Sequence, residues 1–409
     1  MKPSFPRTFV CVASWCLALW AASAAAESFE LTVKAGNHDR TNVPVSVLLE
    51  VAPGAKSATL TDEAGNVLPA QITRPGVGTT MMKPSPNMAE LHFILPSLEK
   101  GRSVTLKGQP SNAAAPLPSF QWKNDTAAEH ADLLWGDRPV MRYMYLSYDD
   151  SSSEKRHDSF KVYHHLFSPG GDRVVTKGPG GQYTHHRGLF FGYCNCGFDG
   201  RRVDTWGGGS GHQVHAGFEG DEAGPVLGRH CVAVDWRAND KTTFVKEQRE
   251  LTVYQVPGGT MVDFASRLST AGGKVTLDGN APHAGFHFRA DQEVAEKTGN
   301  LTYYLRPDGK GELGQARASA MDLPWDAMSF VLGEDRYTTL YLDRPDNPKP
   351  VEYNERTYGR FGSFFRFELD EGKDLVVHYR VWLQDGEMTV EQAAAMSADF
   401  IDPVEVTIK

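Results

Sequence analysis

Histidines are concentrated in the middle of this 409-residue sequence, and they are the first residues that could do chemistry. Eleven of the 14 lie between His130 and His287, and six fall within the 52 residues from His164 to His215. Imidazole titrates near neutral pH and is the commonest metal ligand in proteins. The clustering therefore predicts general acid–base catalysis, a metal site or both, with hydrogen-bonded structural histidines as the alternative.

The densest part is the segment 183–189, which reads Tyr-Thr-His-His-Arg-Gly-Leu. Adjacent side chains of a strand point to opposite faces, so only one of His185 and His186 would enter a given site, whereas a loop would relax this limit. Arg187 beside them is suited to a bidentate pair with a carboxylate. We expect this block to contribute to a site.

A second row of polar groups follows from the alternation in the segment 282–290. Ala284, Phe286, Phe288 and Ala290 would form one apolar face of a strand. The opposite face would carry His283, Gly285, His287 and Arg289, with alternate side chains ~7 Å apart. We interpret this row as the floor of a polar cleft rather than a solvated face, and Gly285 would leave room for a ligand to approach.

Two carboxylates and one indole complete the candidate chemistry. Glu247 and Arg249 fall on an apolar strand face, so they should pair with each other or serve the cleft, where a Glu with a raised pKa is able to act as acid or base. Asp204 offers a second carboxylate, and Trp206 offers a ring face that suits a sugar.

Two further pairs of residues are candidates. Arg356 and Tyr358 are two residues apart and would share a strand face, where the cation would favour the tyrosinate. His212 and His215 lie beside a glycine-rich loop and are candidate metal ligands. A divalent metal such as Zn, Cu, Ni or Fe would take three of His185, His186, His212, His215 and His283, although the spacing matches no specific metal motif.

The elements that must position these residues are mostly strands. Residues 27–108 alternate with a period of two and predict a small β-sandwich module. Residues 109–119 are rich in Pro, Ala and Ser and predict a linker. Residues 120–409 predict a large β-sandwich domain, supersandwich-like and all-β, with the candidate cleft. One helix is expected over 390–399, capped by Thr389 with a capping box to Gln392.

The N-terminus and the charge balance bear on location. Residues 1–26 predict a cleaved signal peptide, with Lys2 and Arg7 before an apolar stretch and alanines at the cleavage site, so we expect a periplasmic or extracellular protein without a membrane span. A net charge of −9 makes nucleic acid an improbable partner. Three cysteines remain after cleavage, namely Cys194, Cys196 and Cys231. They would be free thiols, or one of the first two would form a disulfide with Cys231.

The His-His-Arg-Gly-Leu block resembles a family of secreted bacterial proteins of unknown function that often carry the label "methane oxygenase PmoA". The label does not fit this chain, because a methane monooxygenase subunit spans the membrane. The resemblance implies a large β-sandwich in a carbohydrate context, without an established activity. It covers about residues 137–390 and rests on 185–189, Asp204, Trp206, His215 and the segments 138–143, 283–289, 343–348 and 356–359.

Three functions remain open on this basis. The first is a carbohydrate-active enzyme, either lyase-like on a uronate or oxidised sugar, with histidine as base and arginine against the anion, or a hydrolase that uses Asp204 and Glu247. The others are a non-catalytic glycan-binding protein and a metal-dependent enzyme. The expected catalytic residues are His185, His186, Asp204, Glu247, His283 and His287, and the expected substrate-binding residues are Arg187, Trp206, Arg289, Arg356 and Tyr358.

Overall fold

The computed structural model describes residues 28–51, 54–79, 87–113 and 118–409. The expected signal peptide lies outside these residues. Strands dominate and form antiparallel sheets, which agrees with the expected all-β, sandwich-like fold. No helix among the described residues has the length and apolarity needed to cross a membrane.

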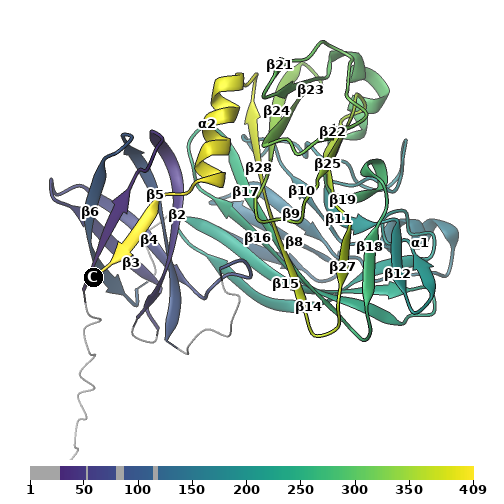
Figure 1. The fold of residues 1–409 in the computed structure, drawn as a ribbon, viewed down its shortest axis with the longest axis horizontal. Coiled ribbons are helices and arrows are strands. Elements are labelled where there is room, and N and C mark those ends of the chain that lie inside the picture. The colour runs from purple at the N-terminus through teal and green to yellow at the C-terminus, as the bar shows by residue number, and fades with distance from the viewer. Residues whose placement is uncertain (1–27, 52–53, 80–86, 114–117) are drawn as a thin grey trace, which may run out of the picture.

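The N-terminal module is a seven-stranded sheet, drawn mostly in purple and blue in Figure 1. Alternate residues such as Val43, Val45 and Leu49 are buried, as the period of two predicts. The strand order is β2 (Arg40–Glu50), β5 (Met88–Leu98), β4 (Val67–Thr73), β3 (Ser57–Asp62), β6 (Ser103–Ser111), β1 (Phe29–Lys34) and β29 (Glu405–Ile408).

Two boundaries differ from the sequence-based division. Strand β6 continues to Ser111, because Ser57 and Ala58 of β3 pair with Ser111 and Pro110, so the linker begins later than residue 109. Strand β29 pairs with β1, so the chain end belongs to the module sheet rather than to the large domain. The module is therefore built from both ends of the described chain.

The large sandwich packs two nine-stranded sheets face to face. The first, called here the site sheet, has the order β22 (Ala320–Met321), β25 (Glu352–Arg356), β26 (Arg360–Phe364), β19 (Ala284–Arg289), β11 (Leu189–Tyr193), β10 (Tyr163–Leu166), β9 (Arg138–Met144), β8 (His130–Trp135) and β7 (Phe120–Asp125). The second, the back sheet, has the order β14 (Gly211–Ala223), β15 (Leu227–Ala238), β16 (Thr243–Tyr254), β17 (Thr260–Thr270), β28 (Asp374–Asp385), β24 (Asp335–Asp343), β23 (Trp325–Leu332), β20 (Tyr303–Arg306) and β21 (Gly309–Lys310).

Aromatic side chains join the two sheets. Phe286 of β19 stacks on Phe264 of β17 at 4.3 Å between ring centroids and on Tyr379 of β28 at 4.9 Å. This contact turns the apolar face of β19 into the core, as the alternation predicts, and turns His287 and Arg289 to the outer face of the site sheet. The face of β28 with Leu375, Val377, Tyr379, Val381 and Leu383 is likewise buried.

The remaining elements are short. A four-stranded sheet contains β13 (Arg201–Val203), β12 (Asn195–Phe198), β18 (Val275–Asp278) and β27 (Phe367–Leu369). Helix α2 (Val390–Ile401) has the predicted capping box between Thr389 and Gln392 and lies at the junction of module and sandwich in Figure 1. Sequence reasoning missed helix α1 (Ser153–Ser159), the turn Ala281–His283, the π-helical turn Val294–Thr298 and the turn Gly299–Leu301.

Candidate functional site

The His-His-Arg-Gly-Leu block forms a tight turn that leads into β11. The backbone N–H of His186 donates to the carbonyl of Tyr183 at 2.9 Å, and Tyr183 has a φ of 54°. Gly188 is required next, because a Cβ there would lie 2.0 Å from the carbonyl oxygen of His164. Since the block is a turn rather than a strand, both histidines reach the same side of the sheet.

Five rings meet at this turn on the outer face of the site sheet. The ring centroids of His185 and His186 are 4.2 Å apart, and that of His283 lies 6.1 Å from His185. Tyr358 stacks parallel to His186 at 6.1 Å. Three segments far apart in the sequence therefore contribute to one group of rings, which we call the histidine cluster (Tyr183, His185, His186, His283 and Tyr358).

The histidine cluster has an exposed layer and a buried layer. Tyr183 is 43% exposed and packs on Tyr358 at 4.6 Å, and His283 is also exposed. His186 is buried, and neither of its ring nitrogens has a hydrogen-bond partner in the described part of the structure. An imidazole without partners is costly in a stable fold, and an unpaired buried polar group calls for an explanation.

His287 and Arg360 form the floor below these rings. His287 Nε2 donates to the carbonyl of Ala284 at 2.9 Å, while His287 Nδ1 accepts from Arg360 at 2.9 Å. This network assigns one neutral tautomer to His287. The ring is fully hydrogen-bonded, so His287 positions its neighbours rather than offering a free nitrogen.

His283 precedes the strand rather than belonging to it. It ends the turn Ala281–His283, and its Nδ1 is 2.9 Å from Asn280 Oδ1. Gly285 does not admit a ligand, because the space beside it is filled by the backbone of β26. A Cβ at Gly285 would lie 1.9 Å from the carbonyl oxygen of Ser363.

Lys161 ties two loops of the site together. Its buried ammonium donates to the carbonyl of His185 at 3.0 Å and to that of Trp206, and it lies 4.5 Å from the Phe190 ring centroid. Burial, reinforced by the charge of Arg187, holds the pKa of Lys161 well below its usual value. Lys177, which donates to the carbonyl of Gly178 at 2.9 Å, has a pKa lowered to about 7 by burial and by nearby arginines.

The predicted arginines differ in what they contact. Arg187 donates to the carbonyls of His157, Asp158 and Thr184, so it positions the turn rather than facing a substrate. Arg289 donates to the carbonyls of Ala290 and Tyr358 and stacks on the Tyr358 ring at 5.1 Å.

Arg289 and Arg356 retain some donor capacity. The Nε of Arg289 is buried without a partner among the described residues. Arg356 is half-buried, and its guanidinium donates to the carbonyl of Glu355 at 2.8 Å.

The imidazoles of the histidine cluster are held neutral. Burial is the largest cause and lowers the pKa of His185 to about 3, with the charges of Lys161, His283 and Arg360 acting in the same direction. Burial and then the Arg360 charge lower the pKa of His186. At neutral pH these rings are therefore unprotonated.

The two carboxylates do not face each other. Asp204 lies in the loop before Trp206, and its Oδ1 accepts from the backbone N–H groups of Trp206 at 2.9 Å and Gly207 at 2.7 Å. Glu247 is sealed inside the sandwich, where it pairs with Arg249 at 2.8 Å and accepts from Trp236 Nε1 at 2.7 Å. The ion pair that the strand pattern allowed for Glu247 and Arg249 is present.

Trp206 is buried rather than displayed. Its ring packs on Phe190 at 4.5 Å and on His287 at 4.6 Å, and it is 1% exposed. The exposed aromatic ring of the site is Tyr183. Sequence reasoning left Tyr183, Lys161, Lys177 and Arg360 out of the site, although Tyr183 and Arg360 stand within the blocks that drew attention.

His212 and His215 lie apart from the histidine cluster. His212 stacks on Tyr148 at 3.8 Å, whereas His215 Nδ1 is 3.1 Å from the hydroxyl of Tyr143. Being three residues apart on β14, they point to opposite faces. The described residues contain no group of three or more His, Cys, Asp or Glu side chains placed to hold a metal ion. Cys194, Cys196 and Cys231 are free thiols.

Comparisons with known proteins give a family and distant structural likenesses. No curated protein matches the sequence. A solved structure of a protein in the glycosyl hydrolase family 38 from Enterococcus faecalis is similar, with 9% sequence identity and a TM-score of 0.45. The likeness covers 93% of this chain and 47% of that one, so this chain spans about half the length of that protein. Residues 130–398, which include the histidine cluster, match a family of unknown function, and the chain belongs to that family (DUF6807).

Proposed function

We propose that this chain is a carbohydrate-active enzyme that performs lyase-type chemistry at the histidine cluster. The observation that carries the proposal is the unpartnered, neutral His186 held against His185 beside the cationic Arg360 and Arg289. The matching substrate is an acidic or oxidised sugar, whose carboxylate or ketone makes the neighbouring C–H bond acidic.

The base in this proposal is His185, with His186 behind it. His185 is half-buried and so is reachable from the surface, and its lowered pKa keeps the ring free to accept a proton. Its backbone carbonyl is held by Lys161, which fixes the ring relative to the sheet. Proton transfer to a positioned base contributes about 10²–10⁴-fold to rate, most where the pKa of the base lies near the operating pH.

Positive charge near the base supports an anionic substrate. Arg360, Arg289 and Lys161 all act on His186, and Asp204 is the carboxylate that acts on His283 and Lys161. Cations outnumber carboxylates around these rings. A uronate carboxylate, and the enolate that forms from it, would be stabilised by this excess.

The reaction step is a β-elimination. His185 removes the proton on the carbon next to the carbonyl group, and the electron pair of that C–H bond forms the new C=C bond. The C–O bond to the leaving sugar breaks, and its oxygen takes a proton from an acid. The Tyr358 hydroxyl is the proposed acid, because it accepts from Arg360 Nε at 3.2 Å and keeps its own hydrogen for donation.

Tyr183 supplies an aromatic surface for the sugar. Its ring is exposed above His186 and Tyr358, and its positive φ is a strained backbone state that a non-glycine residue adopts at a cost of about 1–3 kcal/mol. Strain of this kind is often stored at binding and catalytic sites. The proposed setting is the periplasm or the cell exterior, as the N-terminal sequence suggests.

The test measures turnover on polyuronides and on 3-keto glycosides, with product detected by mass spectrometry and by the ultraviolet absorbance of the new C=C bond. His185→Asn and His186→Asn are each expected to lower kcat/KM by at least about 100-fold. His38→Asn is the matched control and should retain full activity, because His38 is a half-buried histidine of the N-terminal module that pairs with Asp402.

The pH profile gives a second readout. Because burial lowers the pKa of His185 to about 3, the acid limb of kcat/KM should lie well below pH 6.5. Full activity in both cluster variants would exclude the proposal. Glycan binding without any product, unaffected by the two variants, would assign a glycan-binding role instead.

A further inference from the structure

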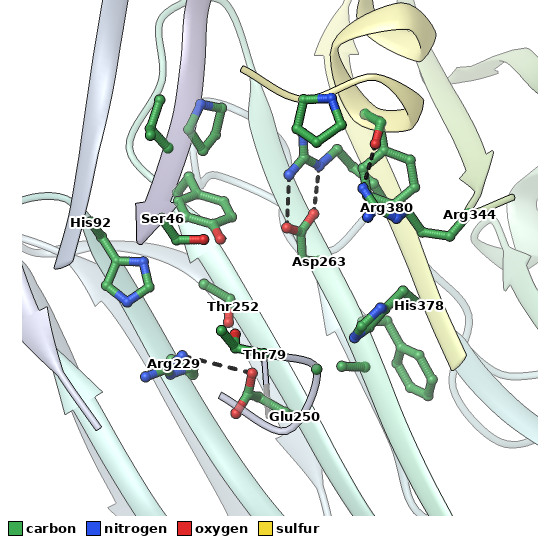
Figure 2. A pocket seen from close by; sticks show the side chains of 18 of the residues that line it. Ser46, Thr79, His92, Arg229, Glu250, Thr252, Asp263, Arg344, His378 and Arg380 are labelled. Carbon is green, nitrogen blue, oxygen red and sulfur yellow. Dashed lines mark hydrogen bonds and ion pairs between the residues drawn. The ribbon is translucent and has the colours of Figure 1, made fainter. Parts of the chain in front are cut away.

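A cavity of about 300 Å³ lies between the N-terminal module and the outer face of the back sheet, away from the histidine cluster. Figure 2 shows it from close by, with Ser46 and His92 on the module side and Thr252, Asp263 and His378 on the back sheet. Junctions between domains are common places for small-molecule sites, and this volume is at the lower end of their usual range. A ligand here would be about one sugar ring in size rather than an oligosaccharide.

The cavity walls are held rigidly by a buried ion network. Arg229 pairs with Glu90 at 3.1 Å and Glu222 at 2.6 Å, and lies 3.8 Å from Glu250. The loop before the cavity is fixed by hydrogen bonds from the backbone N–H of Gly76 to Glu90 at 2.9 Å and from that of Val77 to Glu250 at 3.1 Å. The module and the sandwich therefore present one preformed surface to a ligand.

The lining has nearly balanced charge. Its carboxylates are Glu90, Glu250, Asp263 and Asp399, and its guanidiniums are Arg229, Arg344 and Arg380. The ion pairs already use most of this charge, for Arg380 holds Asp263 through both nitrogens at 2.5 and 2.8 Å. Burial lowers the pKa of His92 to about 4 and also lowers that of His378, so both rings are neutral at pH 7. Among the described lining residues, a strongly charged ligand would find little uncompensated charge beyond the Nε of Arg344, which has no hydrogen-bond partner.

Hydrogen-bonding groups of both kinds remain for a ligand. His92 is buried and its Nδ1 has no partner among the described residues, while its Nε2 lies 2.8 Å from Thr73 Oγ1. Ser46 and Thr252 add hydroxyl groups, each able to donate and accept. Sugar hydroxyls also do both, so they match this mixed lining.

We propose that this cavity binds a small, neutral, polyhydroxylated molecule, namely a neutral monosaccharide. The site is separate from the histidine cluster, and the proposal does not depend on the activity proposed above.

The test titrates the full chain with D-glucose, D-galactose and D-xylose, using saturation-transfer NMR and calorimetry, with D-glucuronate and D-glucosamine as charged comparators. At least one neutral sugar is expected to bind with a Kd in the millimolar range or tighter, and at least about tenfold more tightly than either charged sugar. Ser46→Trp, which fills the cavity from the module side, should weaken binding at least tenfold. The matched control is Ser97→Trp, an exposed serine of strand β5 outside the lining, which should leave the Kd unchanged.

A second variant guards against misfolding of Ser46→Trp. Thr252→Val keeps the side-chain shape and removes one hydroxyl, and it should also weaken binding while the melting temperature stays within a few degrees. Binding should persist in His185→Asn. Failure of all three neutral sugars to bind, equal binding of glucuronate, or binding that is lost in His185→Asn but kept in Ser46→Trp would each overturn the proposal.

Discussion

At the residue scale, the histidine cluster separates groups that contact the surface from groups that hold them. His185, His283 and Tyr183 are accessible, whereas His287, Lys161 and Arg187 have their donors committed to backbone carbonyls or to neighbouring rings. From the sequence, residues of both groups, the accessible ones and the ones that hold them in place, were expected to contact substrate or take part in catalysis. Hydrogen-bond partners are what distinguish a reacting group from a positioning one.

Glu247 provides the sharpest residue-scale prediction. Glu247→Leu would leave Arg249 buried without its partner, and this should lower the free energy of unfolding by about 3–5 kcal/mol. Glu247→Leu/Arg249→Met removes both charges and should recover much of that loss. Denaturant unfolding measures both variants.

Turnover of the folded fraction provides the control for this prediction. If Glu247 has the structural role that its partners indicate, kcat per folded molecule should stay unchanged. Unchanged stability together with lost turnover would instead place Glu247 in the catalytic machinery.

The sequence predicted part of the site because short-range patterns determine short-range geometry. Alternation in 284–290 correctly predicted which side of β19 enters the core. It could not show that Gly285 is packed against Ser363 or that Trp206 is buried under the cluster, because these contacts join strands distant in the chain. Arg360 contacts His287 only through the pairing of β19 with β26.

At the element scale, strand β29 shows the same limit. Its residues 405–408 read as an ordinary strand, yet nothing local indicates that they pair with β1, about 370 residues earlier in the chain. The local signal for α2, a capping box, was by contrast sufficient to predict the helix start at Thr389. Hydrogen bonds between residues close in the sequence can be predicted from it. The pairing of strands that are far apart in the sequence cannot.

Removal of residues 404–409 should destabilise the N-terminal module. The truncation leaves β1 as an open edge and removes Val404 and Val406 from the module core. Each lost backbone hydrogen bond costs about 1 kcal/mol, so the free energy of unfolding should fall by a few kcal/mol and the melting temperature should fall with it. The open edge of β1 should also make the protein associate, which size-exclusion chromatography would detect.

Lys34→Ala is the matched control for this truncation. It removes the exposed ion pair with Glu405 and leaves the backbone pairing intact, so the cost should be at most about 1 kcal/mol. A truncated protein as stable as the full chain would show that β29 is dispensable for the module.

At the scale of the whole molecule, the buried imidazoles couple stability to pH. Burial lowers the pKa of His92 and His165 to about 4 and that of His230 to about 3, and it also lowers the pKa values of His164, His186 and His287. In the unfolded chain these groups titrate near the ordinary pKa of about 6.5. Below that pH the unfolded state binds protons that the folded state does not, so stability falls as pH falls.

Some buried carboxyl groups act in the opposite direction. Burial raises the pKa of Asp326 well above its usual value, and it also raises that of Glu250, so these groups favour the folded state as pH falls toward 4. Among the described residues, histidines with a lowered pKa outnumber the carboxyl groups with a raised pKa, so the histidines dominate between pH 6.5 and pH 5. In this range each imidazole lowers the free energy of unfolding by up to about 1.4 kcal/mol for each unit that the pH falls.

We therefore expect the free energy of unfolding to fall by several kcal/mol between pH 6.5 and pH 5, a large part of a typical total of about 5–15 kcal/mol. Urea unfolding at half-unit steps of pH measures the fall, and potentiometric titration of the folded and unfolded states measures proton uptake directly. The slope of the free energy of unfolding against pH is proportional to the number of protons taken up on unfolding. His230→Phe should lower this number by up to about one relative to the unsubstituted protein, because the imidazole of His230 is fully buried. A stability that is constant from pH 7.5 to pH 5, without net proton uptake on unfolding, would show that these rings are protonated in the folded protein and that the interior of the sandwich is wetter than its packing implies.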